Sequence, residues 1–393
     1  MDASKKHILI TTAWYPTDTT TSGVFVKEQG EALVRAGHRV TVLLVTYSTL
    51  LANYKQPKPN YDKSLLMNVV HLHVVFPLPG RFFSNPDSYF KKVILKRVSQ
   101  WMQEYSRGNS KPDIIHHHCL SDSAYITESI SDQFNIPYLF TEHSNYFKYE
   151  ELNKFNKFET FEDHKRFVKK ACARIAVSEV RARGYEEIFG SSFVVVSNMV
   201  QEIFEVPLMQ KQQSENFTFT CVAIFDKRKR QDILIHAFVN SFKGQKVRLV
   251  LAGNGPMESE YRRLVKEEGM EGQIEILGKQ GREGIVQLFD RSQVAVLSSD
   301  QETFGVVLAE AMFRGLPIIS TISGGPEEIV TVSSGILCKK GNVDAMSKAL
   351  ETMIANYNSY SAEGIRNYAR SRFSEKVIIV QLENLYMNCT GNK

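Results

Sequence analysis

Residues 7–45 read HILITTAWYPTDTTTSGVFVKEQGEALVRAGHRVTVLLV, with two apolar runs on either side of a helical stretch. The run at 7–11 predicts a strand, which a long polar loop follows. The spacing of apolar residues predicts a helix over 24–36, ended by Gly37, and a second strand over 39–45. A strand, a helix and a strand in this order are typical of a parallel sheet covered by helices.

The alternation of short apolar runs with helical stretches continues along the chain and starts again after a polar stretch at 210–216. In the first half, further strands are predicted at 69–75, 113–117, 138–141, 174–177 and 193–196. In the second half, strands are predicted at 217–223, 247–252, 274–277, 294–297, 317–320 and 335–337. The predicted fold class is therefore α/β, with two doubly wound, Rossmann-like domains that face each other across a cleft.

The length and the composition agree with two domains. A chain of 393 residues is too long for one ordinary core. We predict an N-terminal Rossmann-like domain over 1–209, a C-terminal one over 210–370, and a C-terminal helix within 371–393 that can pack back on the N-terminal domain. With 43% hydrophobic and 23% charged residues, neither half is predicted to be disordered. A formal net charge of +5 is too small to imply a nucleic-acid partner.

The compartment is predicted from what the sequence lacks. No apolar run approaches the roughly 20 residues that a membrane-spanning helix needs. The segment 1–6 leads directly into a strand rather than into the apolar region of a signal peptide, so we expect a cytoplasmic protein. The five cysteines are scattered and lack CxxC spacing, which argues against a disulfide framework and a zinc site. We expect them to be reduced.

Glu302 and Glu310 stand eight residues apart behind the predicted strand at 294–297. If a helix begins near Phe304 or Gly305, its first amides lack an intrahelical partner and suit a diphosphate. Glu310 then lies about 1.5 turns inside the helix, where its carboxylate can accept ribose hydroxyls. Alternatively, Glu302 only complements the helix dipole and Glu310 is solvated. We favour the binding role because alanines flank Glu310 in an apolar helix.

Two weaker patterns precede this motif. Gly253, Asn254 and Gly255 form a turn after a predicted strand, and glycines allow a close approach of backbone to ligand. Such turns are common, however, and the three-glycine dinucleotide spacing is absent. The run at 226–230 contains four consecutive cations, which usually form a solvated turn. We expect one of them to have a specific role.

Histidines mark the ends of two predicted strands in the first half. His143 follows the strand at 138–141, so it can donate a hydrogen bond to a sugar hydroxyl or stabilise charge. An ordinary hydrogen-bonded loop histidine is an equally good interpretation. His116, His117 and His118 resemble a metal cluster, but consecutive strand residues alternate between faces and cannot converge on one ion. We predict no metal site.

A basic amphipathic helix is predicted over 89–105. Four cations, Lys91, Lys92, Lys96 and Arg97, accompany a run of apolar residues. Helices of this kind can lie on anionic membranes. The alternative, which we favour, is a surface helix that packs its apolar side on the first domain.

With these residues in view, the chain resembles the family 4 retaining glycosyltransferases of the GT-B fold, among the glycosyl transferases of group 1. The resemblance covers essentially the whole chain, and its motifs occur in the family's order. In the first half they are Trp14-Tyr-Pro, Ser22-Gly23-Val-Phe-Val, 113–118, the His143 segment and 175–178. In the second half they are Lys229 with its following helix, the paired glutamates of 302–310, and the loop at 323–329.

The resemblance implies transfer of a sugar from a UDP- or GDP-linked donor to a hydroxyl, with retention. We predict no metal dependence, because a helix N-terminus and Lys229 would stabilise the leaving diphosphate in place of a metal ion, and we expect no cofactor. The resemblance also implies an acceptor-side N-terminal domain and a C-terminal domain that binds the nucleotide sugar. It assigns catalysis to His143, Glu302 and Lys229. It assigns donor binding to Gly23, Lys229, Phe304, Gly305 and Glu310. From the residues themselves, the donor-binding candidates also include Arg228, Gly253, Asn254, Gly255 and Val306.

The sequence departs from the family pattern at two places. Ala223-Ile224 stands where many relatives carry Gly-Arg, so Lys229 and Arg228 would neutralise the phosphates without that arginine. Ser197-Asn198 stands where Pro-Asn is common, which alters a hinge-side loop.

Two other functions fit such a fold. A nicotinamide-dependent oxidoreductase should show G-x-G-x-x-G after its first strand, and that pattern is absent. A catalytically inactive sugar-nucleotide-binding scaffold should have lost residues such as Glu302 or His143, and both are present. The acceptor is not encoded by any motif. We expect a glycan or a lipid-linked acceptor in cell-surface polysaccharide or glycolipid synthesis, with peripheral contact at the inner face of the membrane as an open alternative.

Overall fold

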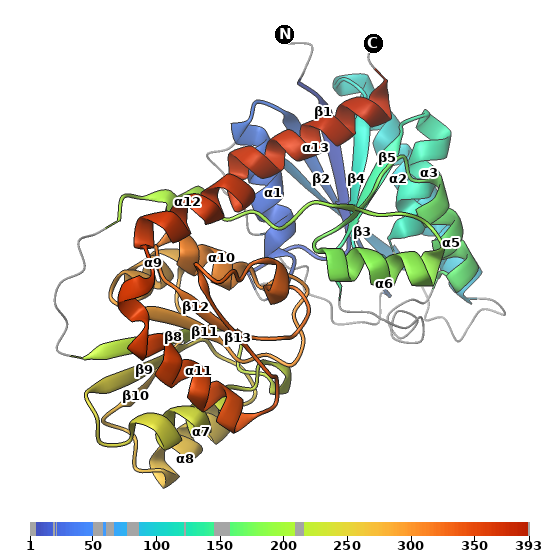
Figure 1. Cartoon of the computed structure of the whole chain (residues 1–393). Coiled ribbons are helices and arrows are strands. Elements are labelled where there is room, and N and C mark those ends of the chain that lie inside the picture. The colour runs from blue at the N-terminus through green and yellow to red at the C-terminus, as the bar shows by residue number, and fades with distance from the viewer. Residues whose placement is uncertain are drawn as a thin grey trace. The chain divides into compact units, whose positions relative to one another are not determined.

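The computed structural model describes residues 5–18, 20, 22–49, 58–59, 67–76, 86–121, 123–144, 158–208 and 216–391. The chain divides into two compact units (Figure 1). Unit 1 comprises Met1–Val196 together with Ile379–Lys393, and unit 2 comprises Ser197–Ile378. The boundary predicted at residues 209 and 210 lies outside the described residues, as does most of the predicted linker at 210–216.

Unit 1 is built on a parallel sheet whose described strands follow the order β3-β2-β1-β4-β5-β6-β7. The strands are β1 His7–Thr12, β2 Arg39–Thr49, β3 Asn68–Phe76, β4 Ile114–His118, β5 Tyr138–Glu142, β6 Arg174–Ala176 and β7 Val194–Val195. The helices are α1 Val24–Arg35, α2 Pro86–Gly108, α3 Ala124–Phe134, α5 Phe161–Lys170 and α6 Glu179–Phe189. The strand order reverses between β1 and β4, which marks the topological switch point of the sheet.

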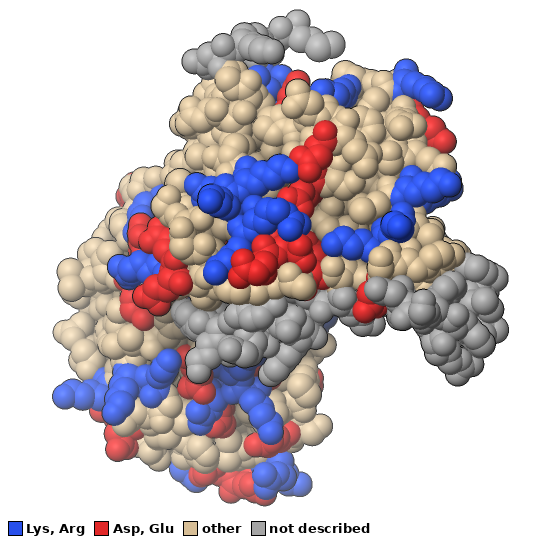
Figure 2. Space-filling model, turned by 90° about the vertical axis from the view of Figure 1, so that its right-hand side faces the viewer, with Lys and Arg blue, Asp and Glu red and all other residues tan. Residues whose placement is uncertain are grey.

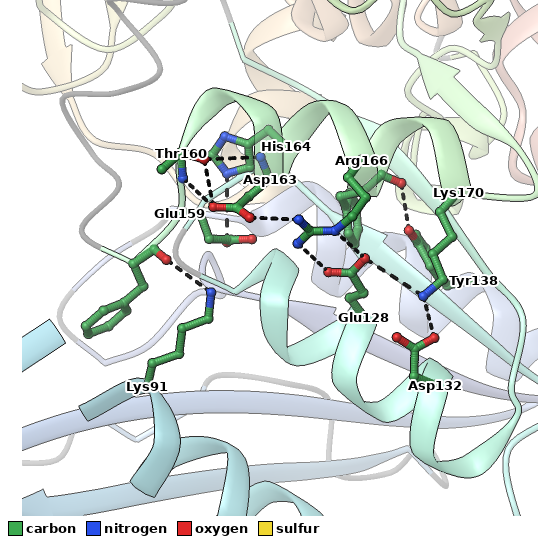
Figure 3. A network of polar contacts seen from close by, with 12 residues as sticks. Lys91, Glu128, Asp132, Tyr138, Glu159, Thr160, Asp163, His164, Arg166 and Lys170 are labelled. Atoms are coloured by element: carbon green, nitrogen blue, oxygen red, sulfur yellow. Dashed lines mark hydrogen bonds and ion pairs between the residues drawn. The ribbon is translucent and has the colours of Figure 1, made fainter. Parts of the chain in front are cut away.

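The helices α2, α3 and α5 share one hydrophobic core with the sheet of unit 1. Ile94 of α2 and Phe167 of α5 are fully buried in it, together with Ile115 and Phe140 of the strands. Charged pairs join α3 and α5 at the surface: Arg166 binds Glu128, and Lys170 binds Asp132 (Figure 3). Because their apolar sides form a common core, these helices are fixed by burial, with the ion pairs contributing little.

Unit 2 repeats this architecture with the described strand order β10-β9-β8-β11-β12-β13, again all parallel. The strands are β8 Phe217–Val222, β9 Val247–Ala252, β10 Ile274–Gly278, β11 Val294–Leu297, β12 Ile318–Thr321 and β13 Gly335–Cys338. The α-helices are α7 Gln231–Phe242, α8 Glu258–Glu267, α9 Arg282–Asp290, α10 Val306–Phe313, α11 Val343–Ala355 and α12 Ala362–Phe373. The 3₁₀ turns in its described residues are η2 Glu202–Glu205, η3 Lys227–Lys229, η4 Pro326–Glu328 and η5 Tyr357–Ser359. The predicted doubly wound α/β class is confirmed for both units.

The last helix, α13 (Glu375–Thr390), begins in unit 2 and ends in unit 1. Within unit 1, its Glu383 binds Lys5 and His38, with both contacts at 2.9 Å. Near its end, Cys389 forms a disulfide with Cys172. The expectation that all five cysteines are reduced is therefore wrong for this pair. No local spacing indicates the bond, because its partners are 217 residues apart and meet only where α13 returns to unit 1.

None of the helices in the described ranges combines the length and the hydropathy that crossing a membrane requires.

Candidate active site

The strongest cluster of predicted site residues lies at the switch point of the unit 2 sheet. The neighbouring strands β8 and β11 are each followed by a loop that carries one of these residues. The ammonium group of Lys229, after β8, lies 2.6 Å from Oε1 of Glu302, after β11. The hydroxyl of Ser299 donates to the same oxygen at 2.6 Å. Glu302 is only 7% exposed, so this pair is a largely desolvated charge contact.

Backbone contacts hold the two loops together. The amide of Asp300 donates to the carbonyl of Arg228 at 2.8 Å, and the hydroxyl of Ser298 donates to the carbonyl of Lys229 at 2.8 Å. The amide of Glu302 donates to the carbonyl of Ser323 at 3.0 Å. The positions of Lys229 and Glu302 are therefore set by the fold around them as well as by their own contact.

The helix α10 begins directly behind Glu302. Gly305 caps it with a φ of 93°, a left-handed conformation that glycine adopts without strain, and Val306 is its first residue. The ring of Phe304 is buried and packs edge-on against Phe373 at 5.3 Å. Phe304 and Gly305 thus contribute backbone at this end of the helix, where the first amides lack intrahelical acceptors and favour an anion.

Glu310 lies inside α10 and is only 3% exposed, so it is not a solvated helix residue. Its Oε1 lies 2.6 Å from Nη1 of Arg282, the first residue of α9. Burial raises the pKa of the Glu310 carboxyl, and the Arg282 guanidinium opposes this shift. Arg282 also lies over the ring of Phe204, 5.9 Å from its centroid. Glu310 is therefore a buried carboxylate held by a partner that reaches the surface.

The glycine turn after β9 is explained by its packing. A Cβ atom on Gly253 would lie 1.9 Å from the carbonyl oxygen of Ala223, and one on Gly255 would lie 2.5 Å from that of Phe225. The carbonyl of Asn254, whose side chain is exposed, accepts a hydrogen bond from the amide of Phe225. The close approach of this turn to the backbone of Ala223 and Phe225 is enough to require glycine at both positions. Binding of a donor by the turn stays a prediction.

Two other cations of the basic run have local partners. Arg228 binds Asp226 at 2.7 Å, and its side chain is 62% exposed. Arg230 binds Asp232 and Asp300. Within this run, Lys229 is the cation that contacts a glutamate of the paired motif.

In unit 1, His143 follows β5 in a turn that its neighbour builds. The buried carboxylate of Glu142 accepts three backbone amides, from Leu120, His143 and Ser144, at 2.8, 2.9 and 2.9 Å. The ring of Phe25, in α1, stacks on that of His143 with the centroids 4.0 Å apart. The turn and the stack together define where the imidazole lies.

Gly23 stands at the start of α1 with a φ of 78°. A Cβ atom there would lie 2.2 Å from the carbonyl oxygen of Trp14, so no larger residue fits. As with the turn after β9, the need for glycine is structural, and contact with a donor stays a prediction.

The histidines of β4 alternate between the faces of the sheet, as strand geometry requires. His116 and His118 stack with their centroids 4.2 Å apart, whereas His117 contacts Thr11 and Thr127. In the part of the chain that the structure describes, no three His, Cys, Asp or Glu side chains are grouped to hold a metal ion.

The sequence interpretation missed Arg282, Ser299 and His118 as neighbours of predicted site residues. Ser299 could have been noticed, since it lies three residues before Glu302. Arg282 is 28 residues from Glu310, and His118 is 25 residues from His143. No local pattern reports such pairs, because the sheet brings together the ends of separate strands.

Two parallel sheets with helices on their faces, and charged residues at the switch point of one of them, define an α/β protein of the GT-B type. HepE of Anabaena, solved in complex with UDP, has this fold: the structures superpose with a TM-score of 0.73 at 17% identity, covering 96% of this chain and 98% of that one.

Family models match both halves of the chain. The model "Glycosyltransferase Family 4" matches residues 22–202, and "Glycosyl transferases group 1" matches residues 208–372. The chain belongs to the group 1 glycosyltransferases of family 4, which confirms the predicted resemblance.

Two curated relatives match part of the chain. N-acetyl-alpha-D-glucosaminyl L-malate synthase of Bacillus anthracis is 30% identical over 168 residues, which are 42% of this chain and 44% of that enzyme. The GDP-mannose-dependent monoacylated alpha-(1-6)-phosphatidylinositol monomannoside mannosyltransferase of Corynebacterium glutamicum is 26% identical over 168 residues, 40% of this chain and 44% of that enzyme. The aligned parts thus span less than half of both relatives.

Proposed function

We propose that this protein transfers a sugar from a UDP- or GDP-linked donor to a hydroxyl group, with retention of the anomeric configuration and without a metal ion. The bond between C1 of the sugar and the diphosphate oxygen breaks, and C1 bonds to the acceptor oxygen. The hydroxyl proton leaves with the diphosphate or to water. The donor is bound mainly by unit 2, and His143 of unit 1 contacts the transferred sugar.

The contact between Lys229 and Glu302 at the unit 2 switch point carries this proposal. Ligands of doubly wound sheets bind where the strand order reverses, outside the carboxyl ends of the strands. Lys229 is the cation at that place, and the open first turn of α10 adds amides. Together they supply the positive charge that a departing diphosphate needs. Glu302 then orients the sugar and helps electrostatically.

The donor base is proposed from the relatives. HepE was solved with UDP, and the mannosyltransferase of C. glutamicum is named for GDP-mannose. Glu310 would accept the ribose hydroxyls, which both nucleotides share, so this residue does not discriminate between the bases. The acceptor is proposed to be a glycan or a lipid-linked sugar of the cell surface, since the mannosyltransferase is named for a phosphatidylinositol mannoside.

A thermal-shift screen tests the proposal. UDP, GDP, ADP, their common sugar conjugates and NAD would each be added with a chelator present. A ligand that binds only the folded protein raises the unfolding midpoint as it saturates its site. We expect a UDP- or GDP-sugar to stabilise the protein, and we expect Lys229→Met to abolish the shift. Lys227→Met is the matched control, because Lys227 belongs to the same 3₁₀ turn and is exposed.

The outcomes separate the alternatives. Stabilisation by NAD alone would replace the proposal with the oxidoreductase. Stabilisation by a sugar nucleotide, without its slow hydrolysis and without transfer to any acceptor, would replace it with the inactive scaffold. A shift that Lys229→Met and Lys227→Met reduce equally would overturn the role of Lys229.

A further inference from the structure

Two of the three histidines at the end of β4 form a buried stack on one face of the unit 1 sheet. His116 and His118 are two residues apart on a strand, so their side chains leave the same face. Their rings lie 4.2 Å apart at an interplanar angle of 24°, and both residues are fully buried. His117 is equally buried, but its Nδ1 lies 3.0 Å from the hydroxyl of Thr11 on the other face.

Hydrogen bonds on either side of this stack connect the C-terminal helix to His143. The hydroxyl of Tyr386, in α13, lies 2.8 Å from Nδ1 of His116. Nε2 of His116 lies 2.8 Å from the hydroxyl of Thr141. Nδ1 of His118 lies 3.1 Å from Nε2 of His143, and these two rings are inclined by only 25°. His118 is thus the residue through which the buried stack reaches His143.

Burial keeps the stacked imidazoles neutral. Desolvation lowers the pKa of His116 and of His118 well below the ordinary value, and the neighbouring imidazoles lower both further. A neutral imidazole carries one N–H group, so in the contact between His118 and His143 one ring donates and the other accepts. The tautomer of His118 therefore determines whether Nε2 of His143 carries a proton.

We propose that His118 is a positioning residue for His143: its Nδ1 fixes the orientation and the tautomer of the His143 ring, and the stack on His116, anchored by Tyr386, holds His118. The inference rests on the proposed function, in which His143 contacts the transferred sugar. A ring already held in one orientation and one tautomer makes its hydrogen bond without reorganising, which is how preorganised groups assist a reaction.

Three variants test this role in the chain of 393 residues. His118→Phe keeps a flat ring against His116 and removes the bond to His143. His118→Asn restores a polar atom close to the position of Nδ1. His117→Phe is the matched control, because it makes the same substitution at an equally buried neighbour on the opposite face. All three would be compared at a temperature where they are folded.

We expect His118→Phe to lower kcat about tenfold to a hundredfold, while KM for the donor stays within about twofold. His118→Asn should recover most of the lost turnover, and His117→Phe should change thermal stability more than kcat. Equal losses of kcat in His118→Phe and His117→Phe, or no loss in His118→Phe, would overturn the proposal.

A second readout does not depend on activity. Nitrogen NMR of the protein labelled at its ten histidines reports the tautomer of each ring, and His143→Gln identifies the signals of His143. We expect His118→Phe to shift those signals and His117→Phe to leave them unchanged. Unchanged signals in His118→Phe would overturn the positioning role. Shifted signals in a protein that transfers no sugar would instead count against the proposed function.

Discussion

At the scale of single residues, the two charged residues of the unit 2 site pair with each other. Lys229 and Glu302 hold each other at 2.6 Å, and Ser299 adds a hydrogen bond to the carboxylate. A diphosphate that binds Lys229 must compete with Glu302 for the ammonium group. Under the proposed function, Glu302 would then face the sugar, where a carboxylate can orient hydroxyls or stabilise positive charge.

Replacing the charge of Glu302 should therefore affect the reaction more than donor binding. We expect Glu302→Gln to lower kcat about a hundredfold or more, with the dissociation constant of the donor changed by less than about fivefold. Single-turnover kinetics and calorimetric titration would measure the two quantities. Asp300→Asn is the control, because Asp300 lies in the same loop and binds Arg230 instead. Full turnover in a folded Glu302→Gln protein would exclude the assigned role.

The second residue prediction concerns the pH dependence of donor binding. In the proposed function the Glu310 carboxylate accepts two ribose hydroxyls, which requires it to be ionised. Burial raises its pKa, whereas Arg282 opposes that rise. Removing Arg282 should raise this pKa further, so affinity should be lost at a higher pH as the solution is acidified. We expect Arg282→Gln to weaken donor binding roughly tenfold near neutral pH, since an orienting partner is also lost.

Titrations with donor from about pH 5 to about pH 8 would show the shift. Arg291→Gln is the control, because Arg291 is exposed at the opposite end of α9. If donor affinity falls at the same pH in Arg282→Gln as in the native protein, the assignment of Glu310 as the titrating group is wrong.

The sequence predicts single residues only where their chemistry is local. The spacing of Glu302 and Glu310 around a helix start is visible in one segment, and so is the cation run that contains Lys229. The partners of these residues are not visible. Arg282 lies at the start of α9, 28 residues before Glu310, and only the order of the strands brings the two together.

At the scale of elements, the sequence predicts a larger part of the structure. Buried strands are visible in it as apolar runs of strand length. The strands β9 and β11 begin and end where the apolar runs predict. The helix predicted at 89–105 is present as the longer α2. Its apolar side, including Ile94 and Val98, is buried in unit 1, which agrees with the interpretation as a surface helix.

The cations of α2 do not share one environment. The ammonium group of Lys91 donates to the carbonyl of Phe158 at 3.2 Å and lies 4.9 Å from the centre of the Tyr125 ring. Lys92, Lys96 and Arg97 are exposed. On the face of the molecule shown in Figure 2, basic and acidic side chains lie next to one another. Contact of α2 with a membrane would therefore have to be electrostatic and would involve three cations.

Flotation with anionic liposomes tests this contact. If α2 binds the membrane surface, neutralising Lys92, Lys96 and Arg97 with glutamine should abolish flotation, since each cation near an anionic surface contributes about 1 kcal/mol. The control neutralises Arg262, Arg263 and Lys266 of α8, which lowers the net charge equally. Flotation that is absent from the native protein, or lost equally in both variants, would rule out a specific contact through α2.

At the scale of the whole molecule, the chain enters unit 2 once and returns to unit 1 through α13. Contacts inside unit 1 hold the C-terminal part of α13: Glu383 binds His38, Tyr386 contacts His116, and Cys389 is bonded to Cys172. The helix was predictable from its apolar pattern. Packing of this helix back on the N-terminal domain was among the expectations. The contacts that hold it were not predictable, because neither a disulfide between residues 217 apart nor a buried tyrosine is visible in local spacing.

This arrangement predicts two calorimetric transitions that respond to different agents. A donor nucleotide bound by unit 2 should raise only the transition of that unit. Reducing the disulfide should lower only the transition of unit 1, by releasing a closed loop worth up to about 5 kcal/mol in the chain-entropy model. At about 2–4 °C for each kcal/mol in a domain of this size, the shift is readily measured.

The double variant Cys172→Ser, Cys389→Ser should show the lowered transition and no response to reductant. A single transition that donor and reductant move together would mean that the two units unfold as one cooperative body.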